Sequence, residues 1–173
     1  MKISISRSSL LTAIVILVLL AALPFAVYEF VTTGEFYMFS KRFVPDLVAR
    51  LSGPGRMRFI FQPVAAILLG ARDGVKDARA GVPPFLSALV FHGARRPGML
   101  RSALVSVRDL VAIAILLDVV SQVLIFRMVH PGVALIFGPV LIATPYALSR
   151  ALANRISRWQ SEAPLRQLPA QKG

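Results

Sequence analysis

The stretch SLLTAIVILVLLAALPFAVY, residues 9–28, contains no charged side chain. Twenty helical residues at about 1.5 Å each cross the roughly 30 Å hydrocarbon core of a bilayer, so the stretch predicts a membrane-crossing helix. Lys2 and Arg7 precede it as in a secretory signal peptide. The apolar run is longer than that of a signal peptide, and residues 23–26 make a poor cleavage site. We interpret the stretch as an uncleaved membrane anchor.

The composition extends this interpretation to the whole chain of 173 residues. Hydrophobic residues make up 56% and charged residues 16%, and the mean hydropathy is +0.70, so we predict an integral membrane protein. Lysine and arginine number 20 against 8 acids, a net charge of +12 that favours anionic lipid headgroups as partners. The absence of cysteine excludes disulfides, thiolate metal sites and cysteine nucleophiles. Two histidines are too few for a metal cluster unless carboxylates complete it, and we expect no metal or cofactor.

Three further stretches are candidates for crossing the membrane. Residues 110–127 and 131–149 are long enough, and the short segment between them predicts an antiparallel helical hairpin in which His130 has a capping or turn role. Residues 57–73 are apolar only over 59–71, and they could still cross if Arg58 and Arg72 reach opposite headgroup layers, which extends their effective length. We predict four crossings. The alternative has three crossings, with residues 59–91 forming a re-entrant hairpin.

Shorter amphipathic segments flank these spans. Residues 36–52 carry an aromatic stripe opposite a polar face that includes Arg50, which favours a helix in the membrane interface over one packed on the rest of the protein. Residues 82–94 are expected at the interface too, and residues 150–159 leave the bilayer along its surface, anchored by Trp159. Residues 160–173 are expected to form a disordered basic tail. The predicted fold is an all-α integral membrane protein with one domain over residues 1–159.

The distribution of lysine and arginine predicts the orientation of the chain. Four crossings with both termini in the cytoplasm place 14 of these residues inside and 6 outside, whereas the three-crossing alternative places 17 inside and 3 outside. The totals favour the alternative. The first helix usually sets orientation by its near flanks, however, and here Lys2 and Arg7 precede it while opposite charges cancel after it. We therefore predict that both termini are cytoplasmic.

Three polar side chains are predicted to lie inside the membrane: Gln62, Asp118 and Gln122. Asp118 and Gln122 stand one helical turn apart, at a depth where an unpaired carboxylate is costly and suited to proton or cation handling. Alternatively, Asp118 joins helices by hydrogen bonds to Gln62, Thr144 or Tyr146. The absence of a second acid in register favours this alternative.

Exposed basic residues form a second predicted site. Headgroup phosphates are their expected ligands, although the same residues could serve only as topology signals. A nucleic-acid site would need interleaved aromatic side chains and a soluble platform, so we expect no nucleic-acid partner. The predicted lipid-headgroup residues are Arg72, Arg95, Arg96, Arg101 and Arg108.

One motif resembles the signature of a membrane enzyme family. Asp73-Gly74, with Asp77 and Ala78-Arg79, resembles the aspartate-rich motif of the CDP-alcohol phosphatidyltransferases, which hold divalent metal. The Ala-Arg pair stands one residue too far from Asp-Gly, and fewer than half of the expected metal ligands are present. We interpret these acids as members of local ion pairs at a solvated helix end. No other catalytic fingerprint is present, so we predict that the protein is not an enzyme.

A broader resemblance rests on four short stretches: residues 56–63 (RMRFIFQP), 70–74 (GARDG), 77–81 (DARAG) and 130–132 (HPG). They are similar to stretches of small uncharacterised bacterial inner-membrane proteins, over about residues 56–155. The resemblance implies a bacterial cytoplasmic membrane and carries no activity.

Together these patterns predict a non-enzymatic accessory or assembly subunit that packs against a larger membrane complex. Small residues and kinks in the last span suit close helix packing: Gly132, Gly138, Pro139, Ala143 and Pro145. The alternatives are an oligomeric transporter or channel protomer with Asp118 and Gln122 in a polar path, and a protein that handles anionic lipids. The expected partners are membrane lipids and either other membrane subunits or further copies of this chain.

Overall fold

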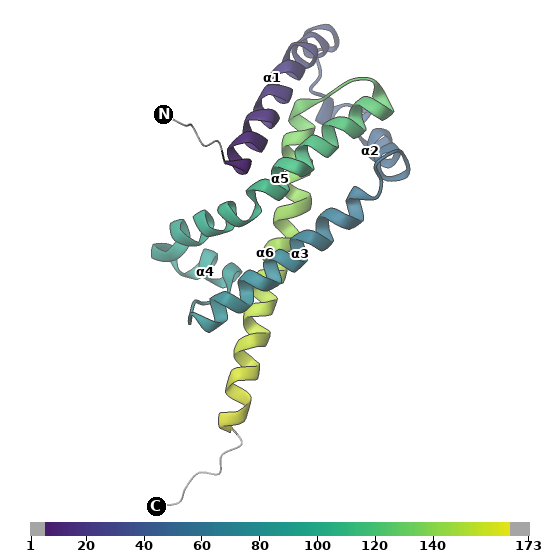
Figure 1. The fold of residues 1–173 in the computed structure, drawn as a ribbon. Helices are drawn as coiled ribbons and strands as arrows, with labels where there is room; N and C mark the ends of the chain where they lie inside the picture. The colour runs from purple at the N-terminus through teal and green to yellow at the C-terminus, as the bar shows by residue number, and fades with distance from the viewer. Residues whose placement is uncertain (1–5, 167–173) are drawn as a thin grey trace, which may run out of the picture. The chain divides into compact units, whose positions relative to one another are not determined.

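In the computed structural model, every element is helical across residues 6–166, the part of the chain that the structure describes, with side chains described as far as Ser161 (Figure 1). This confirms the all-α prediction. The elements are α1 (Arg7–Thr33), η1 (Tyr37–Phe39), α2 (Phe43–Ser52), α3 (Arg58–Arg79), α4 (Phe85–Phe91), η2 (Gly93–Arg95), α5 (Arg96–Phe126) and α6 (Pro131–Arg166).

Within residues 6–166, three helical stretches are long and apolar enough to cross a membrane: Arg7–Thr33, Gly93–Phe126 and Pro131–Ser161. They contain three of the four predicted spans. The remaining predicted span, residues 57–73, falls on α3, which does not reach the same hydropathy because its second half carries a charged side chain at almost every turn. The structure thus has three membrane-compatible helices, and the predicted count of four is not confirmed.

Helix boundaries differ from the prediction at several places. α5 begins at Arg96, well before residue 110, and the segments predicted at 36–52 and 82–94 each divide into a 3-10 turn and a short helix. α6 continues past residue 149, so the predicted separate helix at 150–159 and the first part of the predicted tail, residues 160–166, belong to α6. No glycine or proline stands between Pro145 and Pro164 to end this helix. Residues 167–173 lie outside the described part.

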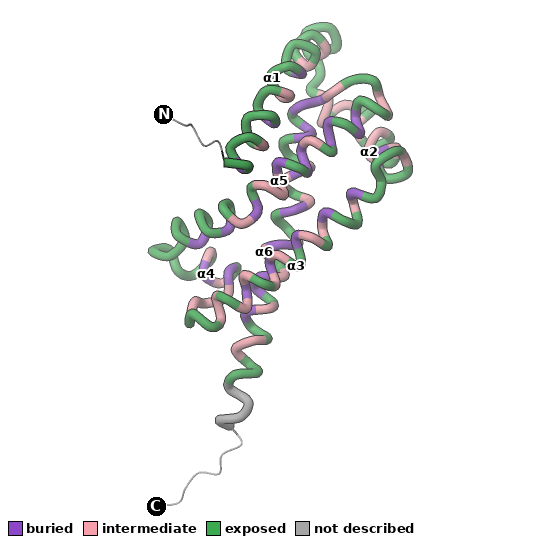
Figure 2. Tube along the Cα trace, in the orientation of Figure 1, coloured by how far each residue is buried: buried purple, intermediate pink, exposed green. Residues whose placement is uncertain are grey.

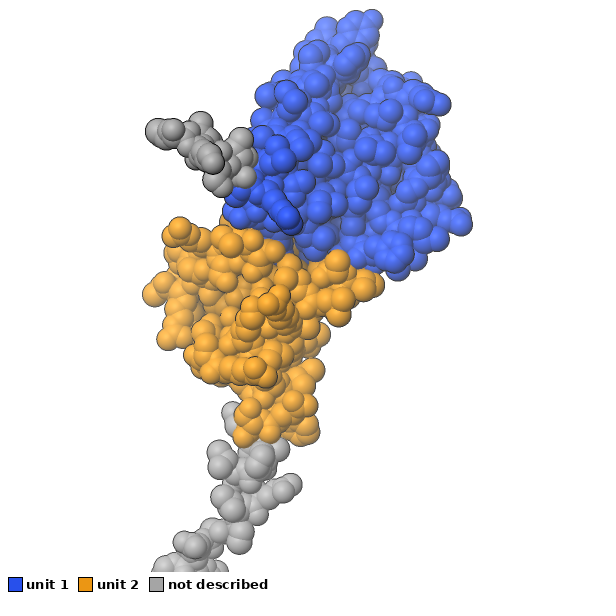
Figure 3. Space-filling model, in the orientation of Figure 1, with its two compact units in different colours: residues 1–63, 107–142 blue, residues 64–106, 143–173 orange. Residues whose placement is uncertain are grey.

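The chain groups into two compact units where the sequence predicted one domain (Figure 3). Unit 1 comprises Met1–Pro63 and Val107–Ile142, and unit 2 comprises Val64–Ser106 and Ala143–Gly173. α3, α5 and α6 each contribute residues to both units.

The apolar core of unit 1 joins α1 to the hairpin of α5 and α6. Val15 of α1 packs with Ala112, Ile115 and Val119 of α5 and with Ala134 of α6. Such small and branched side chains let helices approach closely in a membrane, where packing rather than the hydrophobic effect holds them together.

The predicted hairpin between α5 and α6 is present in unit 1. Arg127 ends α5 in a left-handed conformation, with φ of 57°. The His130 carbonyl accepts the backbone N–H groups of Val133 and Ala134 at 3.1 and 3.3 Å, which begins α6 as the predicted capping role requires. Gly138 then lies close against α5. A Cβ at this position would come within 3.0 Å of the Ile115 backbone nitrogen, so only glycine fits without a shift.

Unit 2 has an equally close helix contact between α3 and α6. A Cβ on Gly70 would collide with the carbonyl oxygen of Tyr146, and a Cβ on Gly74 would collide with that of Arg150. The two glycines stand four residues apart, the spacing that lets two membrane helices touch backbone to backbone. This contact aligns the acids of α3 with the polar residues of α6.

Exposed positions run along most of α1, and buried positions recur along α5 and α6 (Figure 2). Several charged or amide side chains are buried, including Arg50, Asp118, Gln122 and Asn154. Many large apolar side chains are exposed, most of all along α1. A hydrocarbon solvent favours this arrangement because it stabilises apolar surface and penalises unpaired polar groups.

Candidate functional site

A buried group of charged and polar side chains in unit 1 surrounds Asp118, and we call it the Asp118 cluster (Arg50, Arg58, Gln62, Asp118 and Gln122). Oδ1 of Asp118 lies 2.8 Å from Nη1 of Arg58 and 3.4 Å from Nη1 of Arg50. Oδ2 accepts a 2.6 Å hydrogen bond from Nε2 of Gln122. Asp118 is 3% exposed, and Arg50 and Arg58 are 2% and 7% exposed. The carboxylate therefore has two cationic partners.

The sequence predicted different places for the two arginines. Arg50 was expected on the polar face of an interfacial helix, and Arg58 was expected in a headgroup layer. Both expectations are wrong, because α2 and the start of α3 bring these side chains onto Asp118. An uncompensated buried carboxylate is more costly than an ion pair completed by further hydrogen bonds. Nη1 of Arg58 also donates to the Leu117 carbonyl at 3.1 Å.

Gln122 connects the Asp118 cluster to the loop between α5 and α6. Its Oε1 accepts a 2.7 Å hydrogen bond from the backbone N–H of His130, while its Nε2 donates to Asp118. The interpretation of Asp118 as a residue that joins helices agrees with this geometry, but its partners are the two arginines and Gln122 rather than the predicted Gln62, Thr144 or Tyr146.

A small cavity borders the Asp118 cluster. Its volume is about 10 Å³, about the size of one water molecule, and its lining includes Arg58, Gln62 and Asp118. The two predicted residues Gln62 and Asp118 thus face one cavity. Within the described residues, no hydrogen-bond partner is present for Nη2 of Arg50, Nη2 of Arg58 or Nε2 of Gln62. The cluster therefore holds more N–H donors than its acceptors satisfy.

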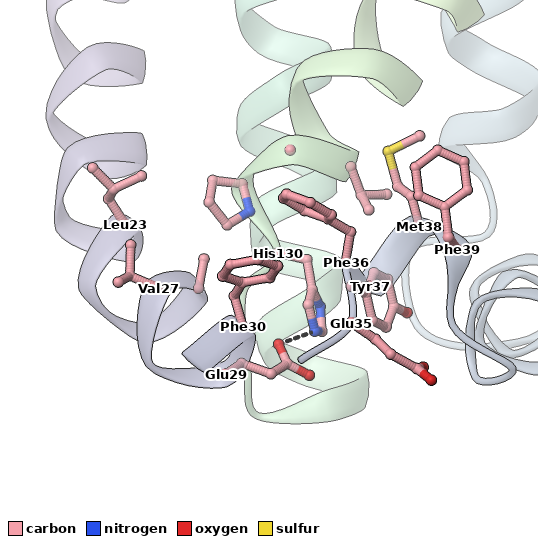
Figure 4. Close-up of a pocket in the computed structure, with 14 residues that line it drawn as sticks. Leu23, Val27, Glu29, Phe30, Glu35, Phe36, Tyr37, Met38, Phe39 and His130 are labelled. Carbon is pink, nitrogen blue, oxygen red and sulfur yellow. Dashed lines mark ion pairs between the residues drawn. The ribbon is translucent and has the colours of Figure 1, made fainter. Parts of the chain in front are cut away.

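Unit 1 has a second, larger pocket at the C-terminal end of α1 (Figure 4). Its volume is about 360 Å³, within the range of small-molecule sites. The walls come from α1, from the segment that contains η1, and from the start of α6. We call it the Glu29 pocket, and its labelled lining residues are Leu23, Val27, Glu29, Phe30, Glu35, Phe36, Tyr37, Met38, Phe39 and His130.

The polar end of the Glu29 pocket links three elements. Nε2 of His130 lies 2.9 Å from Oε2 of Glu29, and the imidazole stacks on the Tyr37 ring with centroids 3.5 Å apart. The Tyr37 hydroxyl donates a 2.6 Å hydrogen bond to Asp46. Burial lowers the pKa of His130, against the opposing charge of Glu29, so the imidazole is neutral near pH 7. Burial and the bond to Asp46 raise the pKa of Tyr37, which keeps its proton.

Sequence reasoning missed this pocket, because it treated His130 only as a capping residue. A signal was present nonetheless. Glu29 and Glu35 stand among Phe30 and Phe36 at the end of an apolar span, in a chain with 8 acids in all.

The two acids that resemble part of an enzyme motif have structural partners in unit 2. Arg150 binds both carboxylate oxygens of Asp77, through Nε at 2.7 Å and Nη2 at 3.1 Å. Its Nη1 donates to the Tyr146 oxygen at 2.9 Å, and the Tyr146 hydroxyl donates to Asp73 at 2.9 Å. Of the predicted local pairs, Asp73 has Lys76 at 3.8 Å. Among the described residues, no three acidic or histidine side chains are placed to hold a metal ion.

The predicted lipid-headgroup residues share one property, which is that all five are exposed: Arg72, Arg95, Arg96, Arg101 and Arg108. Two of them make local contacts. Nη2 of Arg96 donates to the Val90 carbonyl at 2.7 Å, and Nε of Arg108 lies 3.5 Å from Asp109. Their guanidinium groups otherwise face outward, as headgroup binding and topology signalling both require.

The chain was also compared with known proteins. No protein-family model, curated protein or solved structure matches it. The resemblance to small bacterial inner-membrane proteins therefore stays a prediction.

Proposed function

We propose that this chain is a non-enzymatic, multi-pass membrane protein that serves as an accessory or assembly subunit by packing against a larger membrane complex. The observation that carries the proposal is the free apolar surface of α1. The most apolar window of this helix is 11% buried, against 39% and 28% for the other two membrane-compatible stretches. α1 thus has room for contacts with helices of another protein or of a second copy.

The polar interior supports the same proposal. Asp118 has two arginine partners and Gln122, Asp77 is held by Arg150, and Asp73 is held by Tyr146. Side chains satisfied in this way stabilise helix contacts and have little freedom to act on a substrate. They suit a protein whose role is to present a fixed outer surface.

Site-specific photo-cross-linking tests this proposal. A photoreactive residue at Leu17, which is 69% exposed, should form an adduct of discrete mass with a neighbouring membrane protein. The matched control is Val15 on the same helix, which faces the core of unit 1 and is 8% exposed. Exposed positions that yield only lipid adducts, together with a monomeric mass in mild detergent, would exclude the accessory role.

The alternative of an oligomeric transporter has weaker support. Its polar path would run past Asp118 and Gln122, where the cavity has the size of one water molecule. Asp118 would have to leave two arginines to bind a transported proton or cation. If the transporter alternative holds, the unaltered protein should show flux in proteoliposomes and Asp118→Asn should abolish it. If the accessory role holds, neither the unaltered protein nor the variant should show flux.

We further propose a bacterial inner membrane, with both termini in the cytoplasm and α3 as a fourth crossing. The tight packing of Gly70 and Gly74 of α3 against α6 favours a membrane position for α3. A second candidate function, the binding of anionic lipids, rests on the outward-facing arginines of α5 and α3.

A further inference from the structure

The acidic side chains of this chain differ in whether they have a cationic partner. Among the described residues, Asp73, Asp77, Asp109 and Asp118 each lie within 4.0 Å of a lysine or arginine nitrogen. Glu29 and Glu35 have no such neighbour in the same part of the chain, and the one basic group near Glu29 is the imidazole of His130. Asp46 has no such neighbour either, but it accepts the Tyr37 hydroxyl at 2.6 Å. Among the described residues, Glu29 and Glu35 are therefore left with neither a lysine or arginine partner nor a hydroxyl donor, in a protein with a net charge of +12.

Both of these carboxylates line the Glu29 pocket, whose lining contains no lysine or arginine. In Figure 4 Glu29 lies against His130, Glu35 lies at the same end of the pocket with its carboxylate turned away from His130, and Leu23 and Val27 lie farther along α1. Phe30, Phe36, Tyr37 and Phe39 supply four aromatic rings to the walls. The pocket thus has an apolar wall, an aromatic middle and an anionic end.

His130 provides an independent sign of a ligand. The residue is 7% exposed, yet in the described part of the chain its Nδ1 has no hydrogen-bond partner, while its Nε2 lies 2.9 Å from Oε2 of Glu29. Buried polar atoms without partners are rare in native proteins. An ammonium group bound at this end of the pocket would donate an N–H to the imidazole and place a positive charge beside Glu29.

We propose that the Glu29 pocket binds an amphipathic organic cation, with its ammonium group beside Glu29 and His130, at the end of the pocket that also holds Glu35, and with its alkyl chain along Leu23 and Val27. Aromatic side chains stabilise ammonium groups through their π faces, and nearby carboxylates add charge attraction. The ligand carries no phosphate, because a phosphate would face two carboxylates without a lysine or arginine in the lining. This requirement selects an alkylamine over the ethanolamine headgroup of a phospholipid.

Binding of three probes with equal alkyl chains tests the proposal in nanodiscs of zwitterionic lipid. Radiolabelled decylamine, whose ammonium group is protonated at neutral pH and carries N–H donors, should bind the full-length protein with saturation, whereas decanol and decyl sulfate should not compete at equal concentration. Glu29→Gln with Glu35→Gln should weaken cation binding about tenfold or more, the loss expected when both charge contacts go. Asp109→Asn, which alters a half-exposed acid in the same unit, should leave binding unchanged.

A second variant keeps the test decisive if the glutamine protein does not fold. Val27→Trp fills the pocket from an exposed position on α1 and leaves both carboxylates in place, so it should abolish binding without lowering the unfolding temperature of the ligand-free protein. Equal binding of the cation and decanol, or binding unchanged in both variants, would overturn the proposal. Displacement of the probe by phosphatidylethanolamine at equal concentration would also overturn it and assign the pocket to a phospholipid.

Discussion

Removal of the Asp118 carboxylate should destabilise the protein more than any single change at its surface. Asp118→Leu leaves Arg50 and Arg58 buried without their counter-ion, and both are at least nine-tenths buried. Breaking a buried pair in this way costs about 3–5 kcal/mol of unfolding free energy. We expect a loss in that range, measured by reversible unfolding of the purified protein in mixed micelles with circular dichroism.

The distances in the Asp118 cluster rank the two arginines. Arg58 lies 2.8 Å from the carboxylate, within the range of a charge-assisted hydrogen bond, so Arg58→Met should cost about 1.5–3 kcal/mol. Arg50 lies at 3.4 Å, near the limit of hydrogen bonding, and Arg50→Met should cost about 1 kcal/mol. The triple variant with Asp118→Leu should recover most of the stability, because it removes the buried charges together.

Arg108→Met is the matched control for these arginine changes. Its ion pair with Asp109 is about half exposed, so its loss should cost less than about 1 kcal/mol. If Asp118→Leu were no less stable than this control, the two arginines would have to reach water when their partner is lost. That result would refute the buried cluster and favour the polar path of the transporter alternative.

The remaining predictions concern packing, topology, lipids and pH. Gly70→Ala should lower stability by about 1–3 kcal/mol because of its contact with α6, while Gly132→Ala, which meets open space, should be near neutral by thermal unfolding. Impermeant maleimide applied to intact cells should label a cysteine at the exposed Ser52 but not one at the exposed Ser9, and the reverse would replace four crossings with three. A variant in which Arg95, Arg96 and Arg101 are all replaced by neutral residues should retain less cardiolipin on purification than the unaltered protein, and this difference should shrink at high salt. Equal retention of cardiolipin would mean that the three arginines serve only as topology signals. Because burial lowers the pKa of folded His130, the unfolded chain binds more protons below about pH 6.5, so stability should fall as pH drops through that value. His130→Gln should remove this part of the pH dependence of stability. An unchanged profile of stability against pH would contradict its assignment to His130.

The broad class of this protein follows from the sequence, because hydrophobicity accumulates along the chain and needs no knowledge of contacts. The apolar run at residues 9–28 is sufficient to predict α1, and the short link at Arg127 is sufficient to predict the hairpin of α5 and α6. Gln62, Asp118 and Gln122 were predicted to lie inside the membrane in the same way, since each stands inside or beside an apolar run, and in the structure all three side chains are buried.

Partners across the chain could not be predicted, because a partner depends on which helix faces meet. The arginines that neutralise Asp118, Arg50 and Arg58, are 68 and 60 residues away in the sequence. Their sequence surroundings indicated an exposed polar surface for both and gave no sign of a buried partner. Likewise, Asp77 was expected to pair locally and instead binds Arg150, which the Gly70 and Gly74 contact brings alongside.

Length and hydropathy therefore determined that this is an all-helical chain with helices able to cross a membrane, because the free energy of placing a segment in hydrocarbon is nearly a sum over its residues. Only the tertiary structure decided that Arg50 and Arg58 are buried, that His130 faces Glu29, and that two carboxylates line an apolar pocket without a cationic partner. These features depend on distances of a few ångströms between segments far apart in sequence. A charged residue gives the same sequence pattern whether its side chain faces water or a buried counter-ion, and only the packing of the helices distinguishes these two environments.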